Sequence, residues 1–301
     1  MRRFRVAKTA VIGFALSALV VIALPCLSAD LSSPIKYGPP RQLAEIKNGD
    51  IDESSGIAVS IRNRDSFWTH NDSGDRPCLY LINRSGETLA DIRIKGARAK
   101  DWEDIASFRW GRSVYLIVGD TGKSVLSARN TLYIINEPVI NSRVRTVEPA
   151  ITIKFKYEDG HHDCESIAVD PVLGKIYLVT KSTNNKDREC RVYELPFPNT
   201  KGEFELTAQA IAVLKIPMVT AMDISPDGLR AIVLTYSDAY EYTREKDETW
   251  SEAFARGPRR IKMPKRKQGE SICYGPDGKT LYLTDEGKTP PLWEVPVLGD
   301  Q

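Results

Sequence analysis

Acidic side chains recur at one position of a short repeated motif. Glu103, Glu165 and Glu270 each stand two residues before an isoleucine, and Ser55 and Met222 hold the same position in two further copies. Glutamates that share one narrow site repel one another, which raises their pKa values or requires a cation. Ca²⁺ is bound by about 6–8 oxygen ligands. The sequence therefore predicts a metal site, with Ca²⁺ as its ion; protonated or water-bridged carboxyl groups are the alternative. The expected ligands are Ser55, Glu103, Glu165, Asp223 (beside Met222) and Glu270.

The spacing of the motif predicts the fold. Its five copies lie roughly 50 to 60 residues apart, a length that suits one propeller blade of four short strands with their turns. Segments rich in β-branched and aromatic residues follow each copy, as at Ile176–Val179, and no long stretch has a helical period. We predict an all-β propeller of five blades, each with four antiparallel strands. Six blades would result if the long interval between the second and third copies holds a degenerate unit.

The two ends of the repeat region complement each other. The last copy is followed by too few residues for a fourth strand, and the segment Gln42–Lys47 precedes the first copy. An N-terminal strand in the last blade would close the ring and leave no exposed sheet edge. We predict this closure.

Chain direction should bring polar residues to one mouth of the central channel. Adjacent strands of a blade are antiparallel, so an innermost strand begins where the second strand ends. Asp101 and Asp163 lie two residues before Glu103 and Glu165 and should point the same way. Single Asp, Asn and Ser residues at strand ends more often satisfy turn backbone groups, so only the recurrence favours a site. The other residues expected at this mouth are His70, Asn71, Asp72, Asp120, His161, His162, Lys181, Tyr236, Asp238, Asp285 and Glu286.

The N-terminus has the three parts of a secretory signal peptide. A basic start is followed by the apolar run Ala10–Leu24 and by the small residue Ala29, where cleavage is expected. The run is shorter than the ~20 apolar residues of a membrane span, although an uncleaved anchor is the alternative. We predict a leader at residues 1–29, a single propeller domain at 30–301, a periplasmic or secreted location, and no membrane attachment after cleavage.

Charge and cysteine content narrow the possible partners. The formal net charge is +2, and the leader contributes four basic and no acidic residues, so the remaining chain is slightly acidic. No basic stripe is present, which argues against a nucleic-acid partner. Cys78, Cys164, Cys190 and Cys273 lack metal-type spacing. Disulfides are compatible with export, and the pairing is left open.

The motifs also resemble known families. One Ser or Glu at the start of each innermost strand is similar to the central calcium ring of the secreted calcium-activated nucleotidases, which are five-bladed apyrases. The segment Phe67–Gly74 resembles their first blade, whereas Met222 departs from their pattern. A closer resemblance, over nearly the whole mature chain, is to uncharacterised exported bacterial propellers, which have no settled activity. Phytase-like and esterase-like propellers are more distant. The shared segments are Glu53–Gly56, His70–Asp75, Asp101–Asp104, Gly119–Asp120, Asp163 with Glu165, Ser225–Gly228 and Gln268–Glu270.

Two classes of function are compatible with this pattern. The first is a metal-dependent hydrolase, and the resemblance to apyrases and phytase-like propellers implies phosphoester or phosphoanhydride bonds. Histidines would move protons near neutral pH and a lysine would offset substrate charge. The second is a non-enzymatic binding propeller with a structural metal; a lyase or lactonase is a weaker third. We expect a monomer with a small-molecule or glycan ligand at the mouth. The candidate catalytic residues are His70, Asp72, His161, His162 and Lys181.

Overall fold

The computed structural model describes residues 34–72, 74–122, 130–141, 144–182 and 189–299. The predicted leader, residues 1–29, lies outside this part of the chain. Residues from Ile35 onward form one compact unit. Among the described residues, the structure contains no helix with the length and hydrophobicity of a membrane span.

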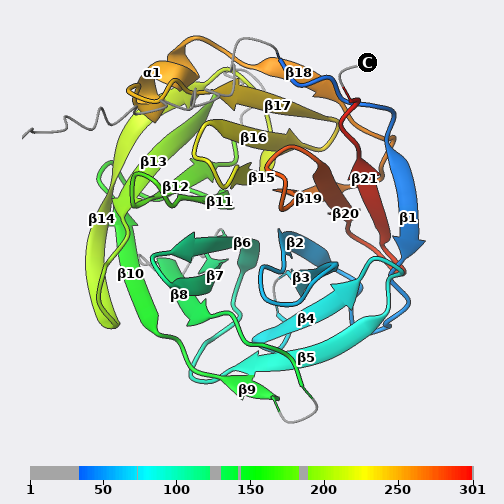
Figure 1. The fold of residues 1–301 in the computed structure, drawn as a ribbon. Helices are drawn as coiled ribbons and strands as arrows, with labels where there is room; N and C mark the ends of the chain where they lie inside the picture. Colours follow the sequence, from blue (N-terminus) through cyan, green and yellow to red (C-terminus); the bar gives the residue numbers. More distant parts are fainter. Residues whose placement is uncertain (1–33, 73, 123–129, 142–143, 183–188, 300–301) are drawn as a thin grey trace, which may run out of the picture. The chain divides into compact units, whose positions relative to one another are not determined.

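The described residues form strands grouped around a central axis, which confirms the β-propeller prediction (Figure 1). The first group contains β2 (Ser54–Val59), β3 (Ser66–Asn71), β4 (Cys78–Asn83), β5 (Thr88–Ile94) and the short β9 (Thr146–Val147). The second contains β6 (Trp102–Trp110), β7 (Ser113–Asp120), β8 (Asn130–Asn136) and β10 (Ile151–Tyr157). The third contains β11 (Cys164–Asp170), β12 (Lys175–Thr180), β13 (Cys190–Pro196) and β14 (Gly202–Leu214), and β14 pairs in parallel with β10. The fourth contains β15 (Val219–Ile224), β16 (Arg230–Thr235), β17 (Asp238–Thr243) and β18 (Arg259–Lys262), with helix α1 (Trp250–Ala255) before β18. The fifth contains β19 (Gly269–Tyr274), β20 (Leu281–Asp285), β21 (Pro291–Val295) and β1 (Arg41–Glu45).

The inner strands β2, β6, β11, β15 and β19 surround the axis. Each packs against the next, and β19 packs against β2, so the ring is closed. Five apolar clusters fill the spaces between successive groups; Phe108 and Ile117 of the second group, for example, share a cluster with Ile167 and Leu178 of the third. Both faces of an inner strand are therefore buried. This explains why β19 is buried at every residue instead of alternating with period two.

The N-terminal strand closes the ring as predicted. β1 pairs antiparallel with β21, and Arg41 lies opposite Glu294. Arg84, in the turn between β4 and β5, reaches the same Glu294 with a distance of 2.6 Å between Nη2 and Oε1. The chain passes from β1 of the fifth group to β2 of the first, and the Arg84–Glu294 ion pair adds a contact between the two groups.

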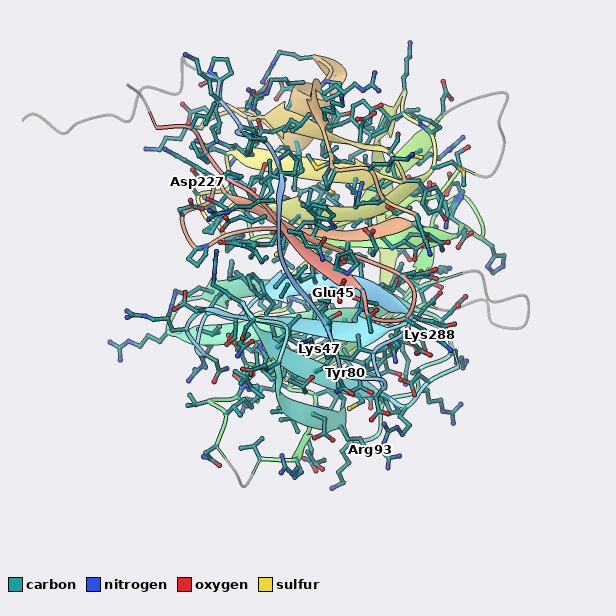
Figure 2. All side chains as sticks on the ribbon, turned by 90° about the vertical axis from the view of Figure 1, so that its right-hand side faces the viewer. Glu45, Lys47, Tyr80, Arg93, Asp227 and Lys288 are labelled. Atoms are coloured by element: carbon teal, nitrogen blue, oxygen red, sulfur yellow. The ribbon has the colours of Figure 1, made fainter. Side chains whose placement is uncertain are left out.

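The two ends of the channel are formed by different parts of the inner strands. Gly228 and Gly278 have φ values of 69° and 66° in the turns that follow β15 and β19, a backbone conformation that glycine adopts without strain. Figure 2 shows Asp227, in one such turn, on the opposite side from Lys288, which follows the second strand β20. Starts of inner strands therefore lie at one end of the channel and their turns at the other. The four cysteines at 78, 164, 190 and 273 are buried free thiols.

One carboxylate links three inner strands. Asp104 of β6 accepts hydrogen bonds from the backbone N–H groups of Ile105 (2.8 Å), Ile167 of β11 (2.8 Å) and Met222 of β15 (3.3 Å). It is fully buried, and buried N–H groups without an acceptor are costly.

We expect Asp104→Ala to lower the free energy of unfolding by about 3 kcal/mol, because buried N–H groups that lose an acceptor cost about 1–3 kcal/mol each. Urea unfolding followed by fluorescence would measure the change. Asp247→Ala, at an exposed position, is the control and should change stability by less than ~0.5 kcal/mol. Equal stabilities of the two variants would contradict the linking role of Asp104.

Candidate metal centre at the channel mouth

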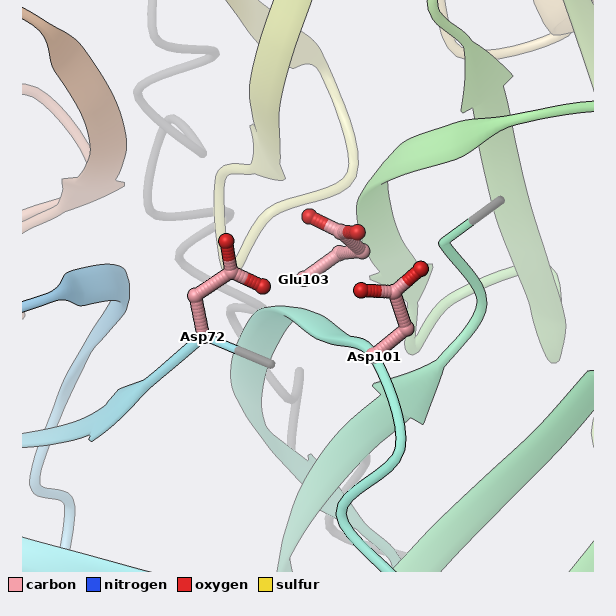
Figure 3. Close-up of side chains that lie close together, drawn as sticks. All are labelled: Asp72, Asp101 and Glu103. Atoms are coloured by element: carbon pink, nitrogen blue, oxygen red, sulfur yellow. The ribbon is translucent and has the colours of Figure 1, made fainter. Parts of the chain in front are cut away.

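Seven carboxylates converge where the inner strands begin. Three groups of three residues each have ligand atoms within 4.8 Å of one another, and shared residues connect the groups. Figure 3 shows the carboxylates of Asp72, Asp101 and Glu103 turned toward one another. We call the full set the acidic ring: Asp72, Asp101, Glu103, Asp163, Glu165, Glu270 and Glu286.

Strand direction places these residues as the sequence analysis expected. Glu103, Glu165 and Glu270 stand near the starts of β6, β11 and β19. Asp72 directly follows the second strand β3, and Glu286 directly follows the second strand β20. Residues that are distant in sequence therefore meet because antiparallel neighbours end where inner strands begin.

A β-bulge at the start of every inner strand aims the ring side chains. The register of β11 against β12 shifts between Cys164 and Ser166, and that of β19 against β20 shifts between Gly269 and Ser271. The extra residues, Glu165 and Glu270, have no partner in the ladder. The register also shifts near the starts of β2, β6 and β15. Bulges often redirect a side chain beside a functional site, and here they explain why glutamate at this position leaves the sheet.

The bulge in β15 corrects the expected ligand of the fourth repeat. The register shift falls between Val219 and Ala221, so Thr220 occupies the position that corresponds to Glu270. The sequence analysis had aligned Met222, two residues later, with Glu270. Asp223 lies farther along β15, where its carboxylate accepts hydrogen bonds from the N–H groups of Ile224 and Tyr274, both at 2.8 Å. The structure does not bring Asp223 into the acidic ring.

Hydroxyl groups fill the bulge positions that lack a glutamate. Ser55 Oγ donates to the carbonyl oxygen of Glu103 at 2.8 Å, and Thr220 Oγ1 donates to that of Gly269 at 2.9 Å. Both hydroxyls thus bond the neighbouring inner strand. Ser55 stands at its predicted position, but its hydroxyl proton is directed to the backbone.

Burial and like charge shape the electrostatics of the ring. Glu103 is 5 % exposed, and burial together with the nearby carboxylates of Glu165 and Asp72 raises its pKa far above the usual range. Burial also raises the pKa of Glu165, although Lys181 opposes the effect. The pKa of Glu286 is raised by burial and by Glu270. Without a cation, the ring can hold its carboxyl groups this close only with some of them protonated.

Lys181 supplies a positive charge at the ring. Its Nζ atom lies 2.7 Å from Oε2 of Glu165 and 5.2 Å from the centre of the Tyr236 ring. Burial opposes its charge, but Glu165 and Tyr236 raise its pKa, so Lys181 is charged. The structure thus brings the predicted residues Lys181 and Tyr236 together with the acidic ring.

Gln268 is a residue of the site that the sequence analysis did not select. Its Nε2 atom donates to Oε1 of Glu270 at 2.7 Å and to the carboxylate of Glu286. It stands two residues before Glu270, as Asp101 stands two residues before Glu103. The period-two relation that identified Asp101 could therefore have identified Gln268.

The structure places the predicted histidines outside the acidic ring. His70 is fully buried against Trp102, its Nδ1 atom is 2.9 Å from the carbonyl oxygen of Asn71, and burial lowers its pKa to about 4. A side chain at position 56 would collide with its ring, so glycine there makes room for it. His162 lies 2.8 Å from a carboxylate oxygen of Asp159 and 2.8 Å from the hydroxyl of Tyr193. His161 is exposed in the same loop, and no contact joins it to the ring.

Three other expected residues have structural partners near the mouth. Asn71 donates to the carbonyl oxygen of Asp50 and to Asp75, and so holds its loop. Asp120 accepts from the N–H group of Asp101 at 2.9 Å and positions that ring residue. Asp238 accepts from Nε of Arg260 in the outer strand β18 at 2.9 Å.

Asp285 is buried behind the ring with Arg266 as its neighbour. Its Oδ1 atom lies 4.0 Å from Nε of Arg266, and burial raises its pKa to about 6. Asn71, Asp120, Asp238 and Asp285 are therefore not members of the acidic ring, and of these four Asp120 bonds to a ring residue.

Comparisons with known proteins are limited to the fold. The chain matches no protein-family model, and no curated protein matches its sequence significantly. The Pan2 WD40 domain of Neurospora crassa is 13 % identical, with 89 % of this chain and 99 % of that chain covered and a TM-score of 0.42. Glutaminyl cyclase of Myxococcus xanthus is 12 % identical, with coverages of 89 % and 100 % and a TM-score of 0.44. The propeller assignment rests on the strand pairing of this chain itself.

The raised pKa of Glu103 predicts how stability depends on pH. Without a divalent cation the folded protein keeps a proton that the unfolded chain has released above the ordinary pKa of 4.5. The free energy of unfolding should therefore fall as the pH rises from about 7 to about 9, and Ca²⁺ should restore it most at the higher pH. His70 adds little slope in this window, because above its ordinary pKa of 6.5 it is mostly neutral in both states.

Denaturant unfolding at a series of pH values, with chelator or with Ca²⁺, would measure both effects. Glu103→Gln should flatten the decline in chelator, whereas Glu148→Gln, at an exposed residue paired with Lys95, should keep it. A stability that is independent of pH in chelator would count against the like-charge account.

Proposed function

We propose that the acidic ring binds Ca²⁺ and that the protein is a metal-dependent hydrolase of anionic esters, with phosphoesters and phosphoanhydrides as the preferred class. The observation that supports this is the convergence of seven carboxylates with overlapping ligand distances at one end of the channel. Carboxylate oxygens are the donors that hard cations prefer, and the ring holds no histidine or cysteine that would favour Zn²⁺.

A set of several overlapping carboxylate groups suits Ca²⁺ better than Mg²⁺. Mg²⁺ demands near-octahedral geometry, whereas Ca²⁺ accepts flexible arrangements and bidentate carboxylates. The ring offers several overlapping groups, and Glu103 belongs to two of them. The residues expected to hold the ion are therefore Glu103 and Glu165 with Asp163, and Asp72 with Asp101 on the other side of Glu103.

The metal-loaded mouth would have the parts that ester hydrolysis needs. A bound cation polarises a phosphoryl or carbonyl oxygen and offsets the negative ring, which would otherwise repel phosphate. Lys181 can hold an anionic group of the substrate beside Glu165, where its position is fixed by the 2.7 Å ion pair. Because the histidines lie elsewhere, protons would be held by carboxyl groups with raised pKa values, such as those of Asp101 and Glu286.

A non-enzymatic binding propeller is the second candidate. The observation that favours it is the position of His70 and His162, which leaves the mouth without a histidine for proton transfer. In this case the metal would tie the first, second, third and fifth groups of strands together. Removing the metal would then lower the free energy of unfolding, and the protein would show no hydrolysis with or without the metal.

The remaining expectations belong to the same proposal. We propose an exported protein, periplasmic or secreted, that loses residues 1–29 and works as a monomer on a small-molecule or glycan ligand, without a nucleic-acid partner. N-terminal sequencing of the protein recovered from the extracytoplasmic fraction would test the cleavage, and light scattering would test the monomer.

The metal and the activity can be tested in one set of variants. We expect the purified mature protein to retain about one Ca²⁺ per chain after dialysis, and Glu103→Gln to lower the affinity at least about tenfold by removing a charged ligand. Elemental analysis and calorimetric titration would measure this. Glu148→Gln is the matched control for the loss of one carboxylate and should bind Ca²⁺ like the parent protein.

Hydrolysis should require both the metal and Lys181. Incubation with ATP, inositol phosphates and chromogenic esters, with Ca²⁺ or with chelator, would show turnover that chelator abolishes. Lys181→Ala should keep the metal and lose activity. Metal binding without turnover of any substrate would leave the binding-propeller candidate and remove the hydrolase.

A further inference from the structure

We propose that the end of the channel opposite the acidic ring is a second binding site, for a small organic anion with an apolar body. A cavity of about 940 Å³ opens there. It is lined by residues at the far ends of all five inner strands, among them Val59 of β2, Phe108 of β6, Val169 of β11, Ile224 of β15 and Tyr274 of β19. The volume falls in the range of pockets that hold small molecules, about 300–1,000 Å³. This proposal does not depend on the metal centre.

One part of the cavity lining is positively charged. Arg64, in the turn after β2, and Arg109, near the end of β6, both line the cavity with exposed side chains. Within the described part of the chain, neither guanidinium makes a hydrogen bond, an ion pair or a ring contact. Guanidinium groups are well suited to carboxylate and phosphate, which they can bind through two parallel hydrogen bonds.

The remaining turns give the lining an apolar part. Pro171 and Val172 follow β11, Pro226 follows β15, and Pro276 follows β19, and all of them line the cavity. The side chain of Val172 is 61 % exposed, although it is apolar. The arginines stand on the first two groups, one in a turn and one near the end of β6, and apolar turn residues stand on the other three. This arrangement favours a ligand that has an anionic part and an apolar part.

Two carboxylates in the lining limit where the anion can lie. Asp223 borders the cavity, but its oxygens accept hydrogen bonds from the N–H groups of Ile224 and Tyr274, which offsets part of its charge. Asp65 is exposed beside Arg64 at the rim. The anionic group therefore belongs between Arg64 and Arg109, with the apolar body directed toward Val172.

Octyl phosphate and octanoate, both used as monomers in solution, are suitable probes. We expect calorimetric titration to show saturable binding of at least one of them in chelator as well as in Ca²⁺, and no binding of octylammonium. The comparison of phosphate with carboxylate identifies the preferred anion. Binding of neither probe, or equal binding of octylammonium, would overturn the proposal, as would binding only to anionic vesicles, which would indicate a membrane-docking surface.

Three variants test separately how the charged and the apolar parts of the cavity lining contribute to binding. The double variant Arg64→Ala/Arg109→Ala should weaken binding of the anionic probe at least about tenfold, the effect of losing one charge-assisted hydrogen bond. Val172→Asp should weaken octyl phosphate as well, through lost apolar contact and added repulsion. Arg93→Ala, on the outer strand β5, is the control and should bind like the parent protein.

All of these substitutions are at exposed positions, so melting temperatures should stay close to that of the parent protein. Unchanged affinity in the double arginine variant would overturn the assignment of the anion to Arg64 and Arg109.

Discussion

The mutual repulsion of buried carboxylates is the constraint on which the proposed site depends. Glu103, Glu165 and their neighbours lie within ligand distance of one another, and the first two are largely buried. Packing alone does not favour this arrangement, because desolvation and like charge both raise the free energy of the ionised ring. The sheets hold the ring together with apolar clusters between every pair of neighbouring groups. The proposed cation would turn the repulsion into a bond between groups of strands, so metal binding would be coupled to stability.

The architecture and the general place of the site could be predicted from sequence because they depend on periodicity and chain direction. Copies of the motif fix the inner strands, and antiparallel pairing then brings the ends of β3 and β20 to the same mouth. Asp101 and Asp163 were found from the period of two along a strand. These inferences need no knowledge of any individual side-chain conformation.

The sequence analysis misplaced residues whose position depends on a local irregularity of the backbone or of the core. Met222 and Ile224 resemble the glutamate-to-isoleucine spacing of the other copies, but the bulge in β15 shifts the true equivalent to Thr220. Composition gives no warning of such a shift, because Thr220 and Met222 lie two residues apart on the same strand and the motif spacing alone does not show which of them is bulged. His70 was misplaced for a related reason: the missing side chain at position 56 opens a space in the core that the ring enters. Proximity in sequence to the mouth did not determine the direction of that side chain.

The same strand direction that concentrates acidic residues at one end of the channel leaves turns at the other, so the two ends have opposite character. An inner strand such as β2 has six residues, which separates its ends by roughly 17–20 Å. Two unit charges at this distance interact by about 1 kcal/mol or less at an effective dielectric constant of about 20, and salt screens the exposed arginines further. Arg64 and Arg109 therefore contribute little to the potential at Glu103, and the carboxylates contribute little at the opposite rim. Substitutions at sites this far apart, with no shared partner, are expected to act additively. The proposed cation site at one end and the proposed anion site at the other are therefore compatible, because the length of one strand is enough to make them nearly independent electrostatically.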